Sequence, residues 1–223
     1  MSAGALAVSR RPEWLIPGLL ILLSLVPAVA GTIRLAEVAP GAPVSETQER
    51  FGDAPIPLML HILAVIPFSF LGALQFAPAF RRRNRTWHRT AGKVLVVMGF
   101  VAALTGLWIA HFYPWAAWDG VAVYVERLVF GMGMLASLVL ALVSIGRRDF
   151  VAHGDWMTRA YAIGLGAGTQ VFTHLPYFLL VGQPGETGRG VMMGAGWVIN
   201  VIVAEWVIRR RRGRTAPSRA LPA

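Results

Sequence analysis

The chain contains no cysteine, and only 14% of its residues are charged. The lack of cysteine excludes disulfides, thiolate metal sites, cysteine-anchored haem and iron–sulfur clusters, so any redox cofactor must be held by nitrogen, oxygen or methionine ligands. The scarcity of charge excludes an ordinary soluble domain, which needs more charged surface. With 56% hydrophobic residues, the composition is typical of an all-α, polytopic membrane protein.

The net charge of +10 does not indicate nucleic-acid binding. The basic residues stand in short segments between long apolar runs, which is the pattern that orients membrane helices rather than the spread of a basic surface. We therefore expect the lipid bilayer, and no nucleic acid, to be the partner of this chain.

Six apolar runs are long enough to cross a hydrocarbon core of about 30 Å. The chain is thus predicted to be a single membrane domain, 1–223, with six transmembrane helices. The first run could be a secretory signal peptide, with Arg10-Arg11 as its basic region and Ala28-Val29-Ala30 as its cleavage site, but a retained helix is favoured. The predicted spans are residues 14–33, 57–80, 91–112, 121–145, 156–181 and 191–208.

Basic residues gather in three segments, 81–93, 147–159 and 209–214, which all fall on one side of the membrane. The alternate loops hold most of the acidic residues, so the positive-inside rule places the basic segments and both termini in the cytoplasm. The expected division is a cytoplasmic N-terminus (1–13), an outer loop with a short amphipathic turn (34–55), a core (57–208) and a basic disordered tail (209–223).

A basic turn followed by a histidine occurs twice. With an offset of 65 residues, His88 aligns with His153, and Arg82-Arg83 aligns with Arg147-Arg148. Under the same offset the second and third spans match the fourth and fifth. We therefore expect a four-helix core of spans two to five, built from two parallel repeats, with spans one and six packed outside it.

The five histidines fall into an inner group and an outer group by depth in the membrane. Two neutral imidazoles from facing helices can clamp the iron of one b-type haem, and helix bundles commonly hold such cofactors. An inner haem would use His88 and His153, and an outer haem would use His61 with His174, or with His111 as the less favoured alternative. Arginines of the inner turns would pair with the propionates. The predicted cofactor-binding residues are His88 with His153, His61 with His174, and Arg89 and Arg159.

Other roles for these histidines stay open. A histidine at the headgroup level is often an interfacial anchor or a hydrogen-bonding group. His153 and His174 are 21 residues apart, roughly 31 Å along one helix, which is wider than two-haem bundles place their ligands. The outer histidines could instead bind zinc or copper, although no His-x-x-x-His spacing supports it. That metal site would comprise His61, His111 and His174.

Two acidic residues within the spans have candidate partners. Glu126 and the adjacent Arg127 are expected to lie in a local or interhelical ion pair that hides both charges. Glu205, in the last span, could pair with Arg159 or His153, which would tie that span to the inner turn.

The stretch from His61 to Glu205 resembles an uncharacterised family of bacterial integral membrane proteins, known only as a domain of unknown function. The resemblance is carried by His61 with Gly72 and Gln75, by residues 88–92 (His-Arg-Thr-Ala-Gly), and by residues 153–161 (His-Gly-Asp-Trp-Met-Thr-Arg-Ala-Tyr). It implies a place in the bacterial inner (plasma) membrane and no established activity.

The bundle is also loosely similar to membrane cytochromes that hold two b haems between four helices. This likeness implies that His61, His88, His153 and His174 are ligands, and that the protein serves transmembrane electron transfer as a membrane oxidoreductase or electron carrier. Two other functions fit the sequence, namely a cofactor-free subunit or assembly partner of a larger membrane complex, and a small-solute transporter. No catalytic residue is predicted, because the chain has no nucleophile–base pair, phosphate loop or paired carboxylates.

Overall fold

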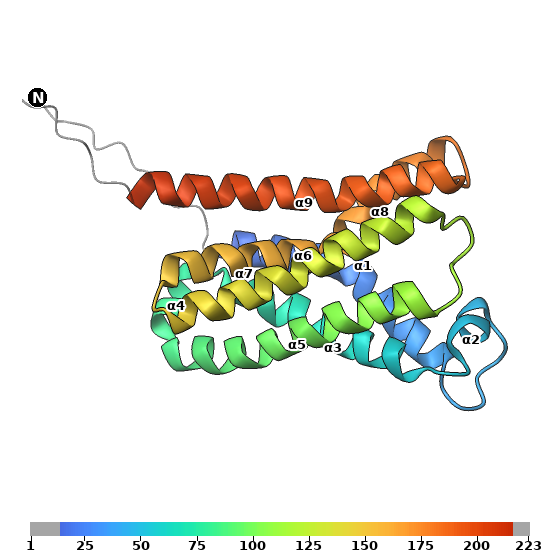
Figure 1. Ribbon diagram of the computed structural model, residues 1–223, viewed down its shortest axis with the longest axis horizontal. Coiled ribbons are helices and arrows are strands. Elements are labelled where there is room, and N and C mark those ends of the chain that lie inside the picture. The colour runs from blue at the N-terminus through green and yellow to red at the C-terminus, as the bar shows by residue number, and fades with distance from the viewer. Residues whose placement is uncertain (1–13, 216–223) are drawn as a thin grey trace, which may run out of the picture.

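The computed structural model describes residues 14–215, and every regular element in this part of the chain is an α-helix (Figure 1). The all-α prediction is therefore confirmed. The longer helices run along the long axis of the molecule, and the short helices α2 and α4 lie at its opposite ends. The helices are α1 (Leu15–Glu37), α2 (Glu46–Phe51), α3 (Ile56–Gln75), α4 (Pro78–Arg83), α5 (Arg85–Phe112), α6 (Val121–Gly146), α7 (Phe150–Gly164), α8 (Gly166–Leu180) and α9 (Glu186–Thr215).

Five of the described helices, α1, α3, α5, α6 and α9, are long and apolar enough to cross a membrane. They coincide with five of the six apolar runs of the sequence. The remaining run, residues 156–181, is divided between α7 and α8, each of which has 15 residues.

The chain changes direction at Leu165, between α7 and α8. The Gly168 N–H donates to the Leu165 carbonyl, a bond that spans one residue fewer than an α-helical bond. Glycines surround this point because other helices come close: a Cβ on Gly166 would collide with Trp197 of α9, and one on Gly168 with the Leu23 backbone of α1. The break therefore coincides with the close approach of α1 and α9, and the proline of α8 lies farther along that helix.

Helices α3, α5, α6 and α7 form a four-membered core. The most extensive contacts join α3 to α5 and α6 to α7, while α5 packs on α6 and α7 touches α3. Helix α1 lies outside this core on α3 and α8, and α9 lies outside it on α6, α7 and α8.

The core centres on Phe68 of α3, which is 2% exposed. Its ring fills the space beside two glycines, Gly99 of α5 and Gly164 of α7, where a Cβ would come within 2.9 and 2.8 Å of it. Tyr161 of α7 packs against Gly72 of α3, and its hydroxyl donates to the Ser69 carbonyl at 2.6 Å. Large rings thus fit against glycines on neighbouring helices, which is the packing that draws helices together in lipid.

Two helix boundaries at one end of the core differ from the sequence expectation. Helix α3 ends at Gln75 rather than near residue 80, because Phe76 and Ala77 turn the chain and Pro78 begins α4. Helix α5 begins at Arg85, six residues before the predicted start at 91, so its first turn includes a histidine.

The last helix is longer than expected. Helix α9 continues through residues 209–215, so the prediction of a disordered tail is wrong for these residues. Arg211 and Arg212 bond the Asp155 carboxylate of α7, which supports the helix up to this point. The predictions for residues 1–13 and 216–223 lie outside the described part of the chain. In the loop 34–55, the expected short turn is α2, which Ser45 caps by accepting from the Gln48 N–H at 3.1 Å.

Replacement of Gly72 by alanine should destabilise the fold by about 1–3 kcal/mol, the usual cost of overpacking. The added Cβ would lie 2.5 Å from Cε2 of Tyr161, whose ring is held by its own hydrogen bond. The matched control is Gly92→Ala, since nothing lies within 4 Å of a Cβ there. Thermal unfolding midpoints in one detergent check this, and equal midpoints for the two variants would contradict it.

Candidate functional site

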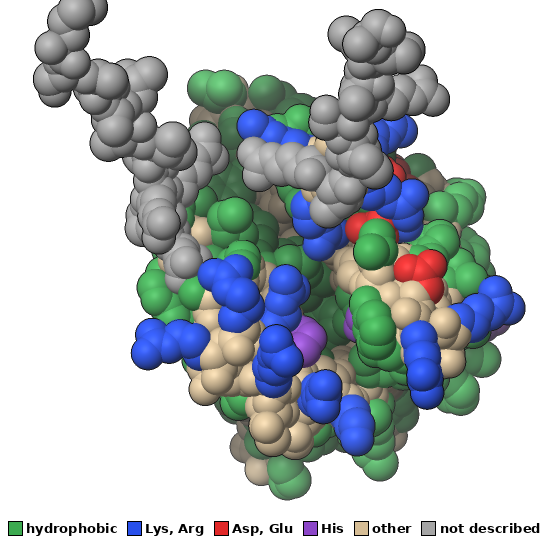
Figure 2. Space-filling view, turned by 90° about the vertical axis from the view of Figure 1, so that its left-hand side faces the viewer, with side chains coloured by type: hydrophobic (Ala, Val, Ile, Leu, Met, Phe, Trp, Pro, Cys, Tyr) green, Lys and Arg blue, Asp and Glu red, His purple; other side chains and the backbone are tan. Residues whose placement is uncertain are grey.

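One end of the bundle, which we call the basic end, carries α4, the α6–α7 turn and the last turns of α9. Figure 2 looks onto this end and shows Lys and Arg side chains over it, with histidine side chains visible between them. The three basic segments of the sequence therefore gather on one face. They contribute Arg81, Arg82, Arg83, Arg85, Arg147, Arg148, Arg209 and Arg210.

Two histidines stand at equivalent positions at the basic end. The His88 N–H donates to the carbonyl of Asn84, which precedes α5, and the His153 N–H donates to the carbonyl of Asp149, which precedes α7. Asp149 also caps α7 by accepting from the Ala152 N–H at 2.9 Å. Each histidine therefore lies one turn into a core helix, four residues after the residue that precedes that helix.

The two histidines also lie at the same depth. Phe68 contacts Gly99 of α5 and Gly164 of α7, and each glycine is 11 residues from the histidine of its helix (99 − 88 and 164 − 153). Eleven helical residues span about 16 Å. His88 and His153 consequently lie in the same layer of the core.

The Nδ1 atoms of His153 and His88 differ in their hydrogen-bond partners. His153 Nδ1 lies 3.0 Å from the Ala141 carbonyl of α6, and because a carbonyl only accepts, Nδ1 carries the proton and Nε2 is left as an acceptor. His88 Nδ1 is buried and has no hydrogen-bond partner among the described residues. Buried polar atoms are rarely left unpaired, so this nitrogen calls for a ligand or a water.

Gln75 adds two more unpaired atoms near the same end. Both its amide nitrogen and its amide oxygen are buried and without a partner within residues 14–215. It is seven residues from Phe68, or about 10 Å, which puts it roughly 6 Å deeper in the core than the two histidines. His88, His153 and Gln75 come from α5, α7 and α3, and together they are the candidate site.

The outer histidines do not converge. His61 Nδ1 lies 2.9 Å from the Ala102 carbonyl of α5, His174 Nδ1 lies 2.8 Å from the Gln170 carbonyl of its own helix, and the exposed His111 contacts the Tyr124 hydroxyl. His61 and His174 line different cavities. In the described part of the chain no three His, Asp or Glu side chains are grouped as a metal site, so the structure does not bring His61, His111 and His174 together.

Arg159 and Arg89, the two arginines predicted to pair with haem propionates, lie in different surroundings. Arg159 is engaged, since it donates two hydrogen bonds to Glu205 of α9, at 2.5 and 3.0 Å, and stacks on the Trp156 ring. This is the expected tie between α9 and the inner turn. Arg89 is exposed on α5. The sequence analysis did not single out Asp155, which is 3% exposed and binds two arginines of α9. The feature that could have indicated it is an acidic residue within the basic segment 147–159.

The opposite end holds a second ion-pair cluster. The expected ion pairing is met in part: Arg127 lies 2.7 Å from Asp119, which also accepts from Arg189 Nε at 2.5 Å, while one oxygen of Glu126 is buried without a partner among the described residues. Burial raises the pKa of the Asp119 carboxyl, but the Arg189 hydrogen bond and the Arg127 and Arg189 charges lower it more, so the pKa falls below its usual value. This cluster ties the loop before α6 to α9.

The apolar helices, the basic end and the paired charges of the opposite end define a polytopic α-helical membrane protein. The family described as "Predicted membrane protein (DUF2306)" matches residues 58–208, and the chain belongs to this family. That membership confirms the resemblance inferred from the histidine-bearing segments, and it does not test the looser likeness to cytochromes. No curated protein and no solved structure matches the chain.

Substitution of Asp119 by asparagine should lower stability by about 1–3 kcal/mol at neutral pH, because two arginines lose their anionic partner and the amide keeps only one acceptor oxygen. The full cost of a broken buried pair is not expected, since both arginines are about a quarter exposed.

The same variant should change the pH profile. A carboxyl whose pKa is lower in the folded state stabilises fully above its unfolded pKa, and this stabilisation is lost as pH falls through the folded pKa, here below about pH 4. Unfolding midpoints from pH 7 to 3 should drop less steeply for Asp119→Asn than for the wild type. Parallel profiles would disprove this role of Asp119.

Proposed function

We propose that this protein is a bacterial inner-membrane electron carrier in which His88 and His153 ligate one b-type haem at the basic end. The observation that carries the proposal is the buried, unpaired Nδ1 of His88, at the same depth as a second histidine whose ring is already oriented. The proposal is narrower than the sequence expectation, which included a second haem.

The residues at the basic end fit such a group. A histidine that ligates a metal usually donates its other N–H to a carbonyl or carboxylate, which fixes the tautomer and aims the free nitrogen. His153 has this arrangement through Ala141, and His88 has a nitrogen in need of a partner. Gln75 offers a free amide to a polar edge of the group, and Arg89 remains exposed for a propionate.

The ligand set also suggests the chemistry. Haem held by two imidazoles has no open coordination position, so it supports one-electron transfer rather than binding of oxygen. The chain's part is to hold both rings at one depth and to keep the His153 proton on Nδ1. An outer haem is disfavoured because His61 and His174 line separate cavities.

We further propose six spans, with α7 and α8 together forming the fifth. Their combined run from residue 150 to residue 180 connects the basic end to the opposite end, as each neighbouring long helix does. Both termini then lie on the side of the basic end, which the positive-inside rule places in the cytoplasm. Two parallel repeats, α3–α5 and α6–α7–α8, are compatible with the equivalent starts of α5 and α7.

The natural absence of cysteine allows a direct test of this topology. Asp53→Cys and Gln183→Cys should react with a membrane-impermeant maleimide on intact spheroplasts, while Arg83→Cys and Arg148→Cys should react only after permeabilisation. If Gln183→Cys were labelled like Arg148→Cys, α7 and α8 would not cross together, and the six-span proposal would fail.

The haem is tested by a reduced-minus-oxidised absorbance spectrum and a haem assay on detergent-purified protein, expressed with ample haem. The wild type should show bands of six-coordinate b haem at one haem per chain. Since even a partner that only orients a metal ligand is worth about 10- to 100-fold in affinity, His88→Ala or His153→Ala should each lower occupancy at least tenfold.

The matched control is His111→Ala, because His111 is exposed and lies at the opposite end. His61→Ala and His174→Ala should also retain one haem per chain, and two haems in the wild type would contradict the single-site proposal. Gel filtration and unfolding midpoints of all variants separate loss of haem from loss of fold. A colourless wild-type protein would refute the haem, and the cofactor-free subunit of a larger complex would replace it.

A further inference from the structure

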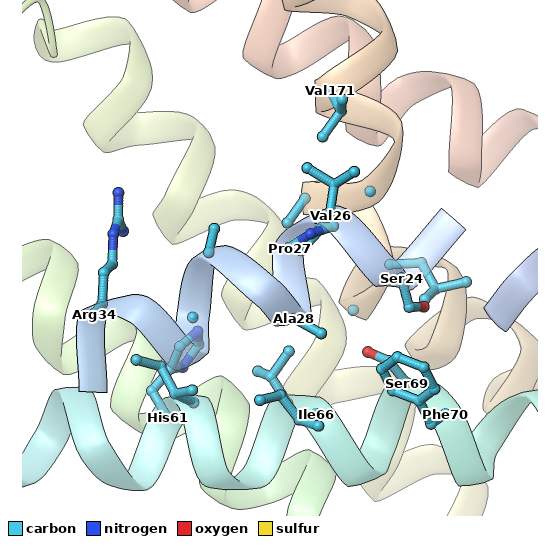
Figure 3. Close-up of a pocket in the computed structure, with 18 of the residues that line it drawn as sticks. Ser24, Val26, Pro27, Ala28, Arg34, His61, Ile66, Ser69, Phe70 and Val171 are labelled. Carbon is cyan, nitrogen blue, oxygen red and sulfur yellow. The ribbon is translucent and has the colours of Figure 1, made fainter. Parts of the chain in front are cut away.

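A cavity of about 330 Å³ lies between α1, α3 and the α7–α8 junction, away from the basic end (Figure 3). This volume is at the lower limit of the roughly 300–1,000 Å³ that small-molecule sites occupy. The cavity has no part in the proposed haem site, whose residues do not line it.

The cavity follows from the way α1 packs. Helix α1 approaches α3 closely at Gly31, where a Cβ would lie 3.1 Å from Ile62, and it approaches α8 closely at Gly168. Between these points Pro27 interrupts the hydrogen bonding of α1, and the break at Leu165 turns α8 away from α3. The space between the three helices is therefore held open by the backbone and not by an adjustable side chain.

The lining is mostly apolar and includes Ile62, Ile66 and Phe70 of α3. In Figure 3, Ser24 and Ser69 lie at one end of the cavity, and Arg34 and His61 lie at the other. The Ser24 hydroxyl lines the far end, but it already donates to the Leu20 carbonyl. A ligand that fills this space must therefore be a long apolar group for most of its length.

Arg34 stands at the other end of the cavity, near the end of α1. It is exposed, and no acidic partner pairs with it among the described residues, unlike the arginines around Asp119. His61 lies beside it in the lining, with Nδ1 bonded to the Ala102 carbonyl. A cation without a partner at the mouth of an apolar cavity is complementary to an anionic headgroup.

We propose that this cavity binds a single-chain amphiphile with an anionic head, such as a long-chain carboxylate. The head lies at Arg34, and the chain runs along α3 toward Ser24. Arg34 and Ser24 are ten residues apart on α1, a path of about 15 Å. The proposal takes one acyl chain as the occupant of this cavity of about 330 Å³, which distinguishes such a ligand from the surrounding two-chain phospholipid.

The test uses the full-length protein in detergent and in phosphatidylcholine vesicles, with a photoactivatable sixteen-carbon fatty acid as probe. Cross-links should map to residues 24–34, 58–70 and 164–171, and unlabelled palmitate should compete. Arg34→Gln should weaken apparent affinity about tenfold, the equivalent of roughly 1.4 kcal/mol. Ala28→Trp, which fills the cavity, should abolish cross-linking at these segments.

Two controls keep the test decisive. Arg83→Gln removes an exposed arginine at the basic end, and Leu22→Trp adds a ring on the exposed side of α1; both should bind like the wild type. Cross-links spread over all lipid-facing helices, or unchanged binding by Arg34→Gln and Ala28→Trp, would overturn the site. Equal binding of the methyl ester of the probe would overturn the anionic head. The haem spectrum is read separately, so failure of one proposal leaves the other standing.

Discussion

The fit of Phe68 and Tyr161 against glycines of neighbouring helices is the constraint on which the rest of this structure depends. In a bilayer the lipid chains are as apolar as the helix surfaces, so helices associate through close packing rather than through the hydrophobic effect. Phe68 of α3 packs against glycines of α5 and α7, and Tyr161 of α7 packs against a glycine of α3. These contacts set the depth of three helices relative to one another, and that depth places the histidines of α5 and α7 in one layer.

At both ends of the bundle, carboxylates are paired with arginines. At the end with Asp119, the buried carboxylate has two arginine partners, and near the basic end Asp155 and Glu205 are paired in the same way. These pairs join α9 and the loops to the core, and their charges are balanced within the fold. Among the described residues, Gln75 and His88 also have buried atoms without a hydrogen-bond partner, as does Glu126. Gln75 and His88 lie near the basic end, and with His153 they form the candidate site.

The broken fifth apolar run has consequences beyond a local bend. By turning at Leu165, α8 leaves α3 and packs against α1 and α9, so the fourth core helix ends within the bundle. The histidine of α8 is carried into a different cavity from the histidine of α3, and a space opens between α1, α3 and α8. One change of direction therefore separates the outer histidines and creates the apolar cavity beside Arg34.

The sequence by itself determined the class of protein, the positions of the apolar helices to within several residues, and the face at which positive charge gathers. These follow from hydropathy and charge, which are properties of short windows of the chain. It also indicated the pairing of Arg159 with Glu205. The sequence did not indicate that Arg127 pairs with Asp119, that Asp155 holds the end of α9, or that the chain turns at Leu165. Nor did it indicate that, in the described part of the chain, His61, His111 and His174 form no common group. Such pairings depend on the rotation and depth of each helix, which are set by steric fit between residues far apart in the sequence.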